Sequence, residues 1–452
     1  MINISLKKNN ELQKKIILFL FFGSLLIIGS SIFDFYGVSI DEAETRSHGF
    51  ITLHYIYEIF SPSRLSTLDG VVLVGKEFLG NVPKLHDFSS KDHGAIIDTF
   101  FAFIEVTFNV ETTKNQYLFR HYLCFIIFCV GIYFFYLLVN FRHNDWRIGI
   151  LASAFLVLSP RMFAESFYNN KDIVFMSLYT ISLYCCFKFI YKPNVKHAVF
   201  FSLTSAIATD VRLMGIMLPF LTIGFLLYLS LGNKNFLKKN LLFIIIFLFL
   251  LPTFIYIFWP YLWPDPIANF AFAFKKFASY PWGMKSLYLG NYEFDNNLPW
   301  HYLITWIGVT TPIFYTFLFI IGFYIILARF VKRLININEQ KEYSDLWRGK
   351  KEMLDLLLFF NFFIPVFLII ILGSTLLDGW RHLYFIYPSF LLLSIYGFQK
   401  IKNRIKKTNL KNYFVILTIL VLLTNLINMV RMHPHQNVYF NLLAGKNPEK
   451  NF

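Results

Sequence analysis

"IILFLFFGSLLIIGSSIF", from Ile16 to Phe33, is a run of 18 residues without a single charged side chain. A helix that crosses the bilayer core of about 30 Å needs about 20 apolar residues. Similar runs recur along the 452 residues of the chain, of which 56% are hydrophobic and 20% aromatic. Backbone inside a bilayer must satisfy its own hydrogen bonds, and the alternation typical of barrel strands is absent, so the runs predict helices. We therefore expect an all-α polytopic membrane protein.

The sequence predicts eleven membrane spans, and the two shortest are at 148–159 and 197–210. No internal repeat, low-complexity tract or flexible linker divides them, so we expect a single membrane domain over residues 1–452. The predicted spans are 15–34, 118–140, 148–159, 173–190, 197–210, 213–231, 240–259, 304–328, 354–373, 383–398 and 413–430.

Lysine and arginine residues predict the orientation of these spans. With the amino terminus inside, 25 of the 42 Lys and Arg residues fall in short inner segments, as the positive-inside rule expects. The segment 34–117, which then lies outside, holds twelve Asp and Glu against six Lys and Arg. The formal net charge of +15 is thus explained by topology, and we expect no nucleic-acid partner. The carboxyl terminus is predicted to lie outside.

Two long segments, 34–117 and 260–303, form the predicted first and second outer loops. In the first, "GFITLHYIYEIF" and "AIIDTFFAFIEVTF" place apolar residues at helical spacing, which is typical of amphipathic helices in the membrane interface. The second is rich in Trp, Tyr and Pro, as in "FWPYLWPDP". Its aromatic rings fit two interpretations, an aromatic belt at the bilayer surface or stacking platforms for sugar rings.

Charged residues recur at the outer ends of the predicted spans. The stretches "SPRMFAESFYNNKDI", "ATDVRLMG" and "LLDGWRHLYFIYP" each carry at least one acid and one base. Charges at bilayer depth are costly and usually face a cavity or one another. Each pair alone is explained equally well by a local salt bridge that seals a helix end. Their recurrence at successive outer turns favours one shared polar cavity.

Such a cavity suits a lipid-phosphate-linked sugar. Arg and Lys bind phosphate, carboxylates accept protons from hydroxyl groups, and aromatic loops stack on sugars. The predicted phosphate-binding residues are Arg161, Lys171, Arg212, Arg381 and His382. The predicted supporting residues are Glu165, Asp172, Asp210, Asp378, Asp92 and His93.

The whole chain resembles the membrane-embedded C-type (GT-C) glycosyltransferases of the protein O-mannosyltransferase and aminoarabinose lipid A transferase superfamily. In those families an acidic pair follows the first span, in contexts close to "SIDEAETR". "SPRMFAESFYNNKDI", "DGWRHLYFIYP" and "HPHQNVYFNLLAG" are similar to stretches of a bacterial branch whose acceptors are mostly undefined. In that branch the last of these stretches usually leads into a further outer segment, whereas this sequence stops at Phe452. The resemblance therefore implies either a fragment or a variant that lacks an outer domain.

The resemblance implies that Asp41 is the catalytic base, with Glu42 as its partner or substitute. In such enzymes an acceptor hydroxyl of a glycan, lipid or protein attacks the anomeric carbon of a polyprenyl-phosphate sugar, and the configuration inverts. It implies action at the outer face of the bacterial cytoplasmic (inner) membrane. A purely structural interpretation stays open, because Ser39 followed by acids in the first turn is also a good helix start.

Neither a metal nor another cofactor is expected. The sequence has no H-x-x-x-H or H-E-x-x-H pattern and no nucleotide-binding fingerprint, and the O-mannosyltransferases that it resembles are thought to work without metal. The alternative function is a polytopic transporter or flippase for a lipid-linked saccharide. Transporters usually show inverted repeats and helices broken at the midplane, whereas here the charges gather at the outer boundary, which favours the enzyme.

Overall fold

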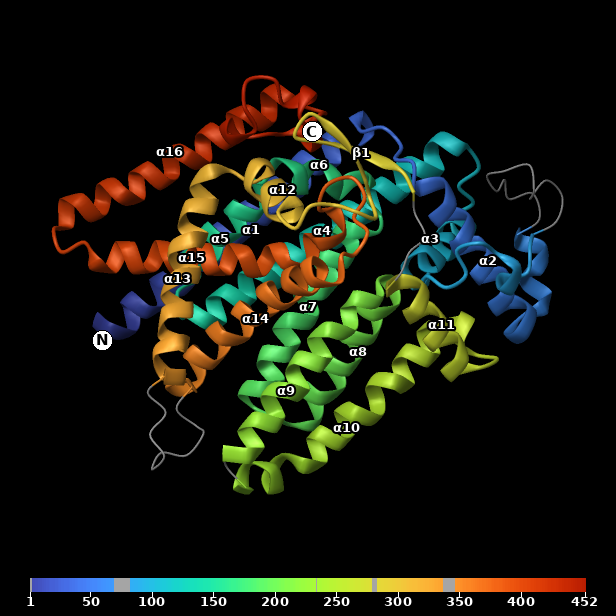
Figure 1. The fold of residues 1–452 in the computed structure, drawn as a ribbon, viewed down its shortest axis with the longest axis horizontal. Helices are drawn as coiled ribbons and strands as arrows, with labels where there is room; N and C mark the ends of the chain where they lie inside the picture. Colours follow the sequence, from blue (N-terminus) through green and yellow to red (C-terminus); the bar gives the residue numbers. More distant parts are fainter. Residues whose placement is uncertain (1, 69–81, 233, 279–282, 336–345) are drawn as a thin grey trace.

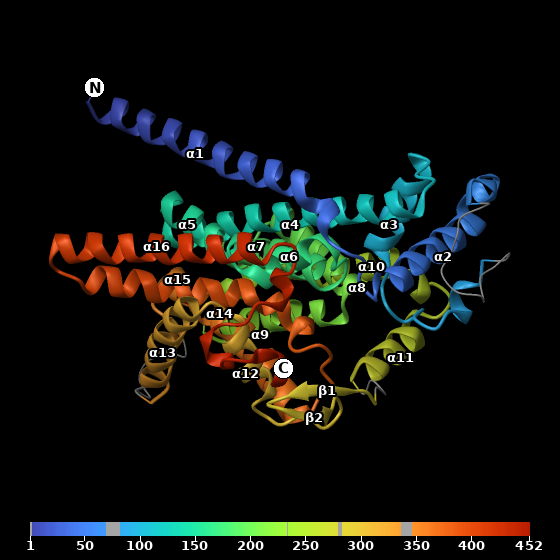
Figure 2. The ribbon, with the colours of Figure 1, turned by 90° about the horizontal axis from the view of Figure 1, so that it is seen from above.

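The structure, a computed structural model, describes residues 2–68, 82–232, 234–278, 283–335 and 346–452. Its long helices pack into one bundle, and α2 (Glu42–Phe60), α3 (Ile96–Thr107) and α11 (Pro266–Ala278) gather at one end of it (Figures 1 and 2). Within the described ranges, strands occur only as one two-stranded sheet. The prediction of an all-α membrane fold is therefore confirmed.

Eight helical segments are long and apolar enough to cross a membrane, counted over the described residues. A ninth is obtained if α5 (Trp146–Val157) and α6 (Pro160–Tyr168), which meet at a bend of 70°, form one broken span. The eight correspond to α1 (Ile2–Ile32), α4 (Thr113–His143), α7 (Asp172–Tyr191), α9 (Met217–Gly232), α10 (Lys234–Phe258), α13 (Ile313–Ile335), α14 (Gly349–Leu372) and α16 (Thr408–Met432).

Three of the eleven predicted spans fall outside these eight helices. One, 148–159, belongs to the bent pair α5 and α6, which leaves 197–210 and 383–398. They correspond to α8 (Val195–Val211) and α15 (Tyr387–Arg404), both of which pack inside the bundle. In α8 the buried face carries Ser202, Ser205 and Thr209, each fully enclosed by neighbouring helices. A helix surrounded by protein needs less hydrophobic surface than one facing lipid, since small polar residues satisfy their hydrogen bonds on neighbouring backbone.

The predicted span 304–328 is wrong in its bounds, because the structure divides it. A short helix, α12 (Tyr302–Thr310), ends before Pro312, and α13 begins at the next residue. Proline has no N–H to donate and its ring blocks the preceding turn, so a continuous helix through this point is disfavoured.

The two predicted outer loops contain most of the remaining structure. In the second, β1 (Lys285–Tyr288) and β2 (Asn291–Phe294) pair antiparallel across the two-residue turn Leu289–Gly290, where both residues have positive φ. Short 3-10 helices complete the chain: η1 (Phe33–Phe35), η2 (Pro62–Leu68), η4 (Leu85–Asp87), η5 (Leu213–Ile216), η6 (Pro260–Leu262), η8 (Arg381–Ile386), η9 (Gln436–Val438), η10 (Leu442–Ala444) and η11 (Pro448–Lys450).

Helix α3 confirms the amphipathic pattern predicted for the first outer loop, and it turns its acids inward. Phe100 and Phe103 are exposed, whereas Asp98 and Glu105 are buried on the opposite face. An apolar outer face is what a helix lying on a bilayer surface presents. The buried acids require partners inside the protein, which the site provides.

Close packing of α13 against α15 depends on two glycines. A Cβ atom added to Gly322 would lie 1.9 Å from the carbonyl oxygen of Leu393, and one added to Gly397 would lie 2.1 Å from that of Leu318. Small residues at such positions let helix backbones approach each other within a membrane. These glycines therefore fix the separation of the two helices.

The substitution Gly322→Ala is expected to lower the thermal midpoint of the purified protein, because its methyl group overlaps backbone that cannot move aside. Overpacking of this kind costs about 1–3 kcal/mol. The matched control is Gly224→Ala in α9, where an added Cβ meets nothing within 4 Å. Equal midpoints for the two variants in a detergent melt would contradict the role given to the α13–α15 contact.

Membrane orientation can be tested with single cysteines at exposed positions. We expect Ser63→Cys, in the first outer loop, to react with an impermeant maleimide from outside, and Lys406→Cys, between α15 and α16, only after permeabilisation. The parent protein is the control, since its four cysteines lie within α4 and α7. The opposite labelling pattern would place every candidate site residue on the inner side.

Candidate active site

Four chain segments bring charged side chains together where their helices begin or end. Asp41 directly precedes α2, Lys171 directly precedes α7, Arg212 directly follows α8, and Arg381 opens η8. Arg381 donates to the Asp41 carboxylate through one terminal nitrogen, and its other terminal nitrogen lies 3.2 Å from Asp378. Residues far apart in the sequence thus form one cluster.

Asp172 lies at the centre of this cluster. Its side chain is only 1% exposed and forms an ion pair with Arg212, while its second oxygen lies 3.9 Å from Arg381. Asn169 holds the same carboxylate from the preceding turn, and its own side-chain oxygen accepts a hydrogen bond of 2.7 Å from the Asp172 N–H. A buried carboxylate flanked by two guanidinium groups stays ionised and fixes both of them.

The cations of the cluster have unused binding capacity. The Nε atoms of Arg212 and Arg381 are buried without a hydrogen-bond partner. Burial, reinforced by Arg212, lowers the pKa of Lys171, and the pKa of Arg381 is raised by Asp172, Asp41 and Asp378 against the effect of burial. Burial and Arg212 lower the pKa of His382 to about 3, so this imidazole is neutral near pH 7. Unfilled guanidinium donors suit an oxyanion such as phosphate.

The two adjacent acids of "SIDEAETR" have different surroundings. The side chain of Asp41 is 41% exposed, makes no capping hydrogen bond and faces Arg381. Glu42 is 2% exposed, and its two oxygens contact the Ser39 N–H at 2.6 Å and His121 Nε2 at 2.8 Å. The helix-start interpretation therefore accounts for Glu42 but not for Asp41, whose carboxylate is accessible and makes no capping hydrogen bond.

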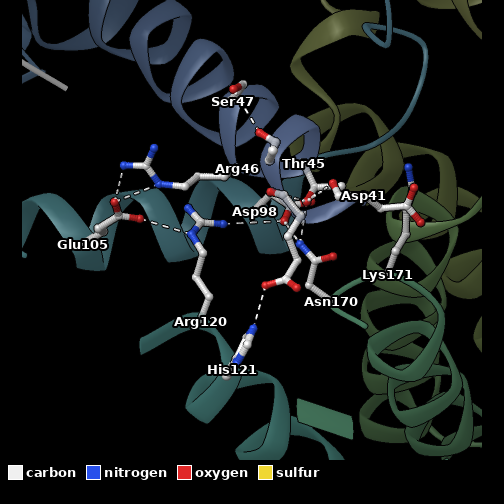
Figure 3. Close-up of polar contacts among 12 residues, drawn as sticks. Asp41, Thr45, Arg46, Ser47, Asp98, Glu105, Arg120, His121, Asn170 and Lys171 are labelled. Atoms are coloured by element: carbon white, nitrogen blue, oxygen red, sulfur yellow. Dashed lines mark hydrogen bonds and ion pairs between the residues drawn. The ribbon is translucent and has the colours of Figure 1, made fainter. Parts of the chain in front are cut away.

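A buried network of charges lies behind Asp41 (Figure 3). Glu105 accepts hydrogen bonds from Arg46 Nε at 3.0 Å and from Arg120 Nε at 3.1 Å. Asp98 accepts one of 3.0 Å from Asn170, and burial raises its pKa to about 6 against the effects of Arg120 and Lys171. Buried charges are tolerated when they are paired in this way, so the network ties α2, α3, α4 and the turn before α7 together.

Sequence reasoning missed this network. The signal that could have found it is the spacing of Asp98 and Glu105, which are seven residues apart and so lie on one face of α3. Asn170 stands directly before Lys171 in the charged stretch "SPRMFAESFYNNKDI". No pattern in the sequence shows that these residues meet Arg46 and Arg120.

Arg161 and Glu165 of α6 make contacts of their own beside the cluster. Arg161 donates a hydrogen bond of 3.1 Å to the carbonyl oxygen of Tyr439, and its guanidinium group lies over the ring of Phe440. Arg161 therefore holds the C-terminal segment. Glu165 is buried and accepts a hydrogen bond of 2.8 Å from Tyr384.

Asp210, Asp92 and His93 make their closest contacts with the first outer loop and α11. The Asp210 carboxylate accepts a hydrogen bond of 2.8 Å from the N–H of Ile96, the first residue of α3, and thereby anchors that helix to α8. Asp92 pairs with Lys276 of α11 at 2.5 Å and lies 3.7 Å from His93. In the described parts of the chain, no three His, Cys, Asp or Glu side chains are grouped as metal ligands.

Comparison with known proteins gives matches by family and by fold. The family model of dolichyl-phosphate-mannose-protein mannosyltransferases matches residues 101–259. The crystal structure of ArnT from Cupriavidus metallidurans in the apo state is similar, with a TM-score of 0.50 at 14% identity over 87% of this chain and 61% of ArnT. The structure of ArnT from the same organism bound to undecaprenyl phosphate has a TM-score of 0.52 at 12% identity, over 91% of this chain and 70% of ArnT. No curated protein matches the chain by sequence.

The chain has the GT-C fold. ArnT is an aminoarabinose transferase of this fold class, so the predicted resemblance is confirmed. The chain spans about 61% of the length of apo ArnT. In the present structure, the cluster around Asp41, Asp172, Arg212 and Arg381 lies where α2, α7, α8 and η8 begin or end.

Removal of Arg381 is expected to weaken binding of polyprenyl phosphate by roughly ten- to hundredfold, since a hydrogen bond to a charged group contributes about 1.5–3 kcal/mol. Arg381→Lys should lose less than Arg381→Ala, because lysine keeps the charge but not the planar fork. Binding is measured by titration of each purified variant, with thermal midpoints recorded alongside. Arg64→Ala, an exposed arginine of the first outer loop, is the charge-matched control. Unchanged binding in Arg381→Ala would exclude this phosphate site.

Proposed function

We propose that the protein is a glycosyltransferase that moves a sugar from a polyprenyl-phosphate donor to a hydroxyl group at the outer face of the cytoplasmic membrane. The observation that carries the proposal is the contact between one accessible carboxylate, Asp41, and Arg381, one of a group of cations on the GT-C fold. A base and an anion site side by side are what this reaction needs. ArnT, whose structure with undecaprenyl phosphate has a similar fold, supports a lipid-linked phosphate as the donor.

In the proposed reaction Asp41 removes the proton of the acceptor hydroxyl as its oxygen attacks the anomeric carbon. The bond between that carbon and the phosphate oxygen breaks on the opposite face, so the configuration inverts. Polyprenyl phosphate leaves with the electron pair, and the proton stays on Asp41 until water takes it. Arg212, Arg381 and Lys171 stabilise the negative charge that develops on the leaving phosphate, which preorganised donors do best when they are already in place.

The contact between Arg381 and Asp41 links the proposed phosphate site to the proposed base. The guanidinium group is shared by Asp41, Asp172 and Asp378. A bound phosphate takes up part of these donors and frees the Asp41 carboxylate to act as a base. Donor binding would thus precede activation of the acceptor.

The function is tested by incubating the purified protein with polyprenyl phosphates that carry labelled hexoses or aminopentoses, together with a membrane extract. Transfer of label to a glycan, lipid or protein supports the proposal, and the labelled product identifies the acceptor. Movement of the intact labelled donor across vesicle membranes without transfer would indicate the alternative, a transporter or flippase. Neither transfer nor movement with any donor would reject both functions.

Asp41→Asn is expected to lower transfer by about a hundredfold or more, the scale for loss of a general base. Asparagine still accepts a hydrogen bond from Arg381, so donor binding and thermal stability should remain near those of the wild type. The measurement is the initial rate of transfer at saturating donor.

The matched control for this variant is Glu44→Gln. Glu44 lies in the same first turn of α2 but is exposed and bonds to Ser90 rather than to the cations. The Glu44→Gln variant also removes one negative charge from the start of α2, and its transfer rate should stay close to that of the wild type. Full activity of Asp41→Asn would remove Asp41 from the mechanism.

A further inference from the structure

We infer that His121 is a positioning residue that acts through Glu42 to aim Asp41 at the reacting hydroxyl. The inference rests on the proposed function, because it assigns a role to a residue one contact removed from the proposed base. His121 lies on α4 and is 1% exposed, and its Nε2 atom contacts Glu42 Oε2 at 2.8 Å. Figure 3 shows the imidazole reaching from below toward the start of α2.

Glu42 links His121 to the backbone before Asp41, and Thr45 holds the backbone of Asp41 from the other side. The second oxygen of Glu42 accepts the Ser39 N–H at 2.6 Å, so the carboxylate links α4 to the backbone that precedes the base. On the other side, the carbonyl oxygen of Asp41 accepts hydrogen bonds of 3.0 Å from both the N–H and the hydroxyl of Thr45. The backbone at Asp41 is thus held by hydrogen bonds on both sides, one at the Ser39 N–H and two from Thr45.

Because Asp41 and Glu42 are adjacent at the start of α2, fixing the Glu42 side chain also fixes the direction of the Asp41 side chain. Successive residues of an α-helix are separated by about 100° around its axis. With the Glu42 side chain held in the protein interior by His121, the Asp41 side chain faces elsewhere, toward Arg381 and the accessible side of the cluster. Loss of the His121 contact lets the first turn of α2 rotate and swings the base away from this direction.

The two ring nitrogens of His121 have different surroundings. Its Nδ1 atom is buried without a hydrogen-bond partner, whereas its Nε2 atom is directed at Glu42. A histidine that served only to fill the core would be replaced at no cost to the position of Asp41. Because a misplacement of about 1 Å at a reacting group can cost a hundredfold in rate, a positioning role has a kinetic signature.

The test compares His121→Leu and His121→Gln with the wild type in the transfer assay. We expect His121→Leu to lower kcat by about ten- to hundredfold while the KM for donor changes by less than about twofold, since the cations that hold the phosphate are untouched. His121→Gln, whose amide N–H can replace Nε2 as the donor to Glu42, should recover a large part of kcat.

Gln116→Leu is the matched control. Gln116 is a buried polar residue of the same helix, and it bonds to the carbonyl oxygen of Val110 at 2.9 Å rather than to Glu42. Both leucine variants should lose thermal stability, but only His121→Leu should lose kcat beyond its folded fraction. Equal losses of kcat in the two variants would mean that His121 acts as a structural residue only.

A double variant separates positioning from stability. If His121 acts through Asp41, then Asp41→Asn with His121→Leu should be no slower than Asp41→Asn alone, because the base whose position is lost is already absent. A further loss of tenfold or more in the double variant would overturn the inference. An inactive wild-type protein would reject the proposed function itself, whereas an active wild type with an equally active His121→Leu would reject only the role of His121.

Discussion

Pairing of charges at the ends of the helices is the constraint on which this structure depends. Ionised side chains near a bilayer lose their hydration and persist only beside opposite charges or in contact with water. Asp172 meets this condition by contacting Arg212 and Arg381, which belong to segments far from it in the sequence. The same rule holds elsewhere in the bundle, where Asp355 pairs with Arg142 and Arg329. The ion pairs therefore fix where the helices of the bundle meet.

The cluster around Asp172 differs from the buried network of Asp98 and Glu105 because one of its carboxylates, that of Asp41, is accessible. Arg212 and Arg381 each keep a buried Nε without a partner, and the Asp41 carboxylate is partly exposed. Behind them, Asp98, Glu105 and their arginines form a paired and buried network. A buried layer of ion pairs that supports an accessible carboxylate is an arrangement suited to binding and catalysis by preorganised groups.

Helix α3 shows how the membrane setting reverses the usual distribution of residues. Its phenylalanines face outward and its acids face the protein interior, because a lipid surface covers apolar side chains and the arginines of α2 and α4 neutralise the acids. Asp210 of α8 holds the first turn of α3 in place by accepting from the Ile96 N–H. The position of the first outer loop over the cluster is thus set by polar contacts rather than by an apolar core alone.

The sequence by itself determined that the chain spans a membrane, which segments are long helices, and that acids follow the first span. These features are local, since they depend on hydrophobicity within about 20 residues and on helical spacing. It also indicated the resemblance to GT-C transferases, through short motifs that occur in order along the chain. The interior helices α8 and α15 were predicted as spans because composition does not show which helices other helices surround.

Only the tertiary structure decided which of the marked residues act together. It separated Asp41, beside Arg381, from Glu42, beside His121, although the two are adjacent in sequence. It gave Arg161 contacts with the C-terminal segment. These outcomes depend on contacts between residues 79 to 340 positions apart, and neither spacing nor composition encodes which helix ends will meet. The physical reason is that the direction of a side chain follows from the packing of its helix against all the others.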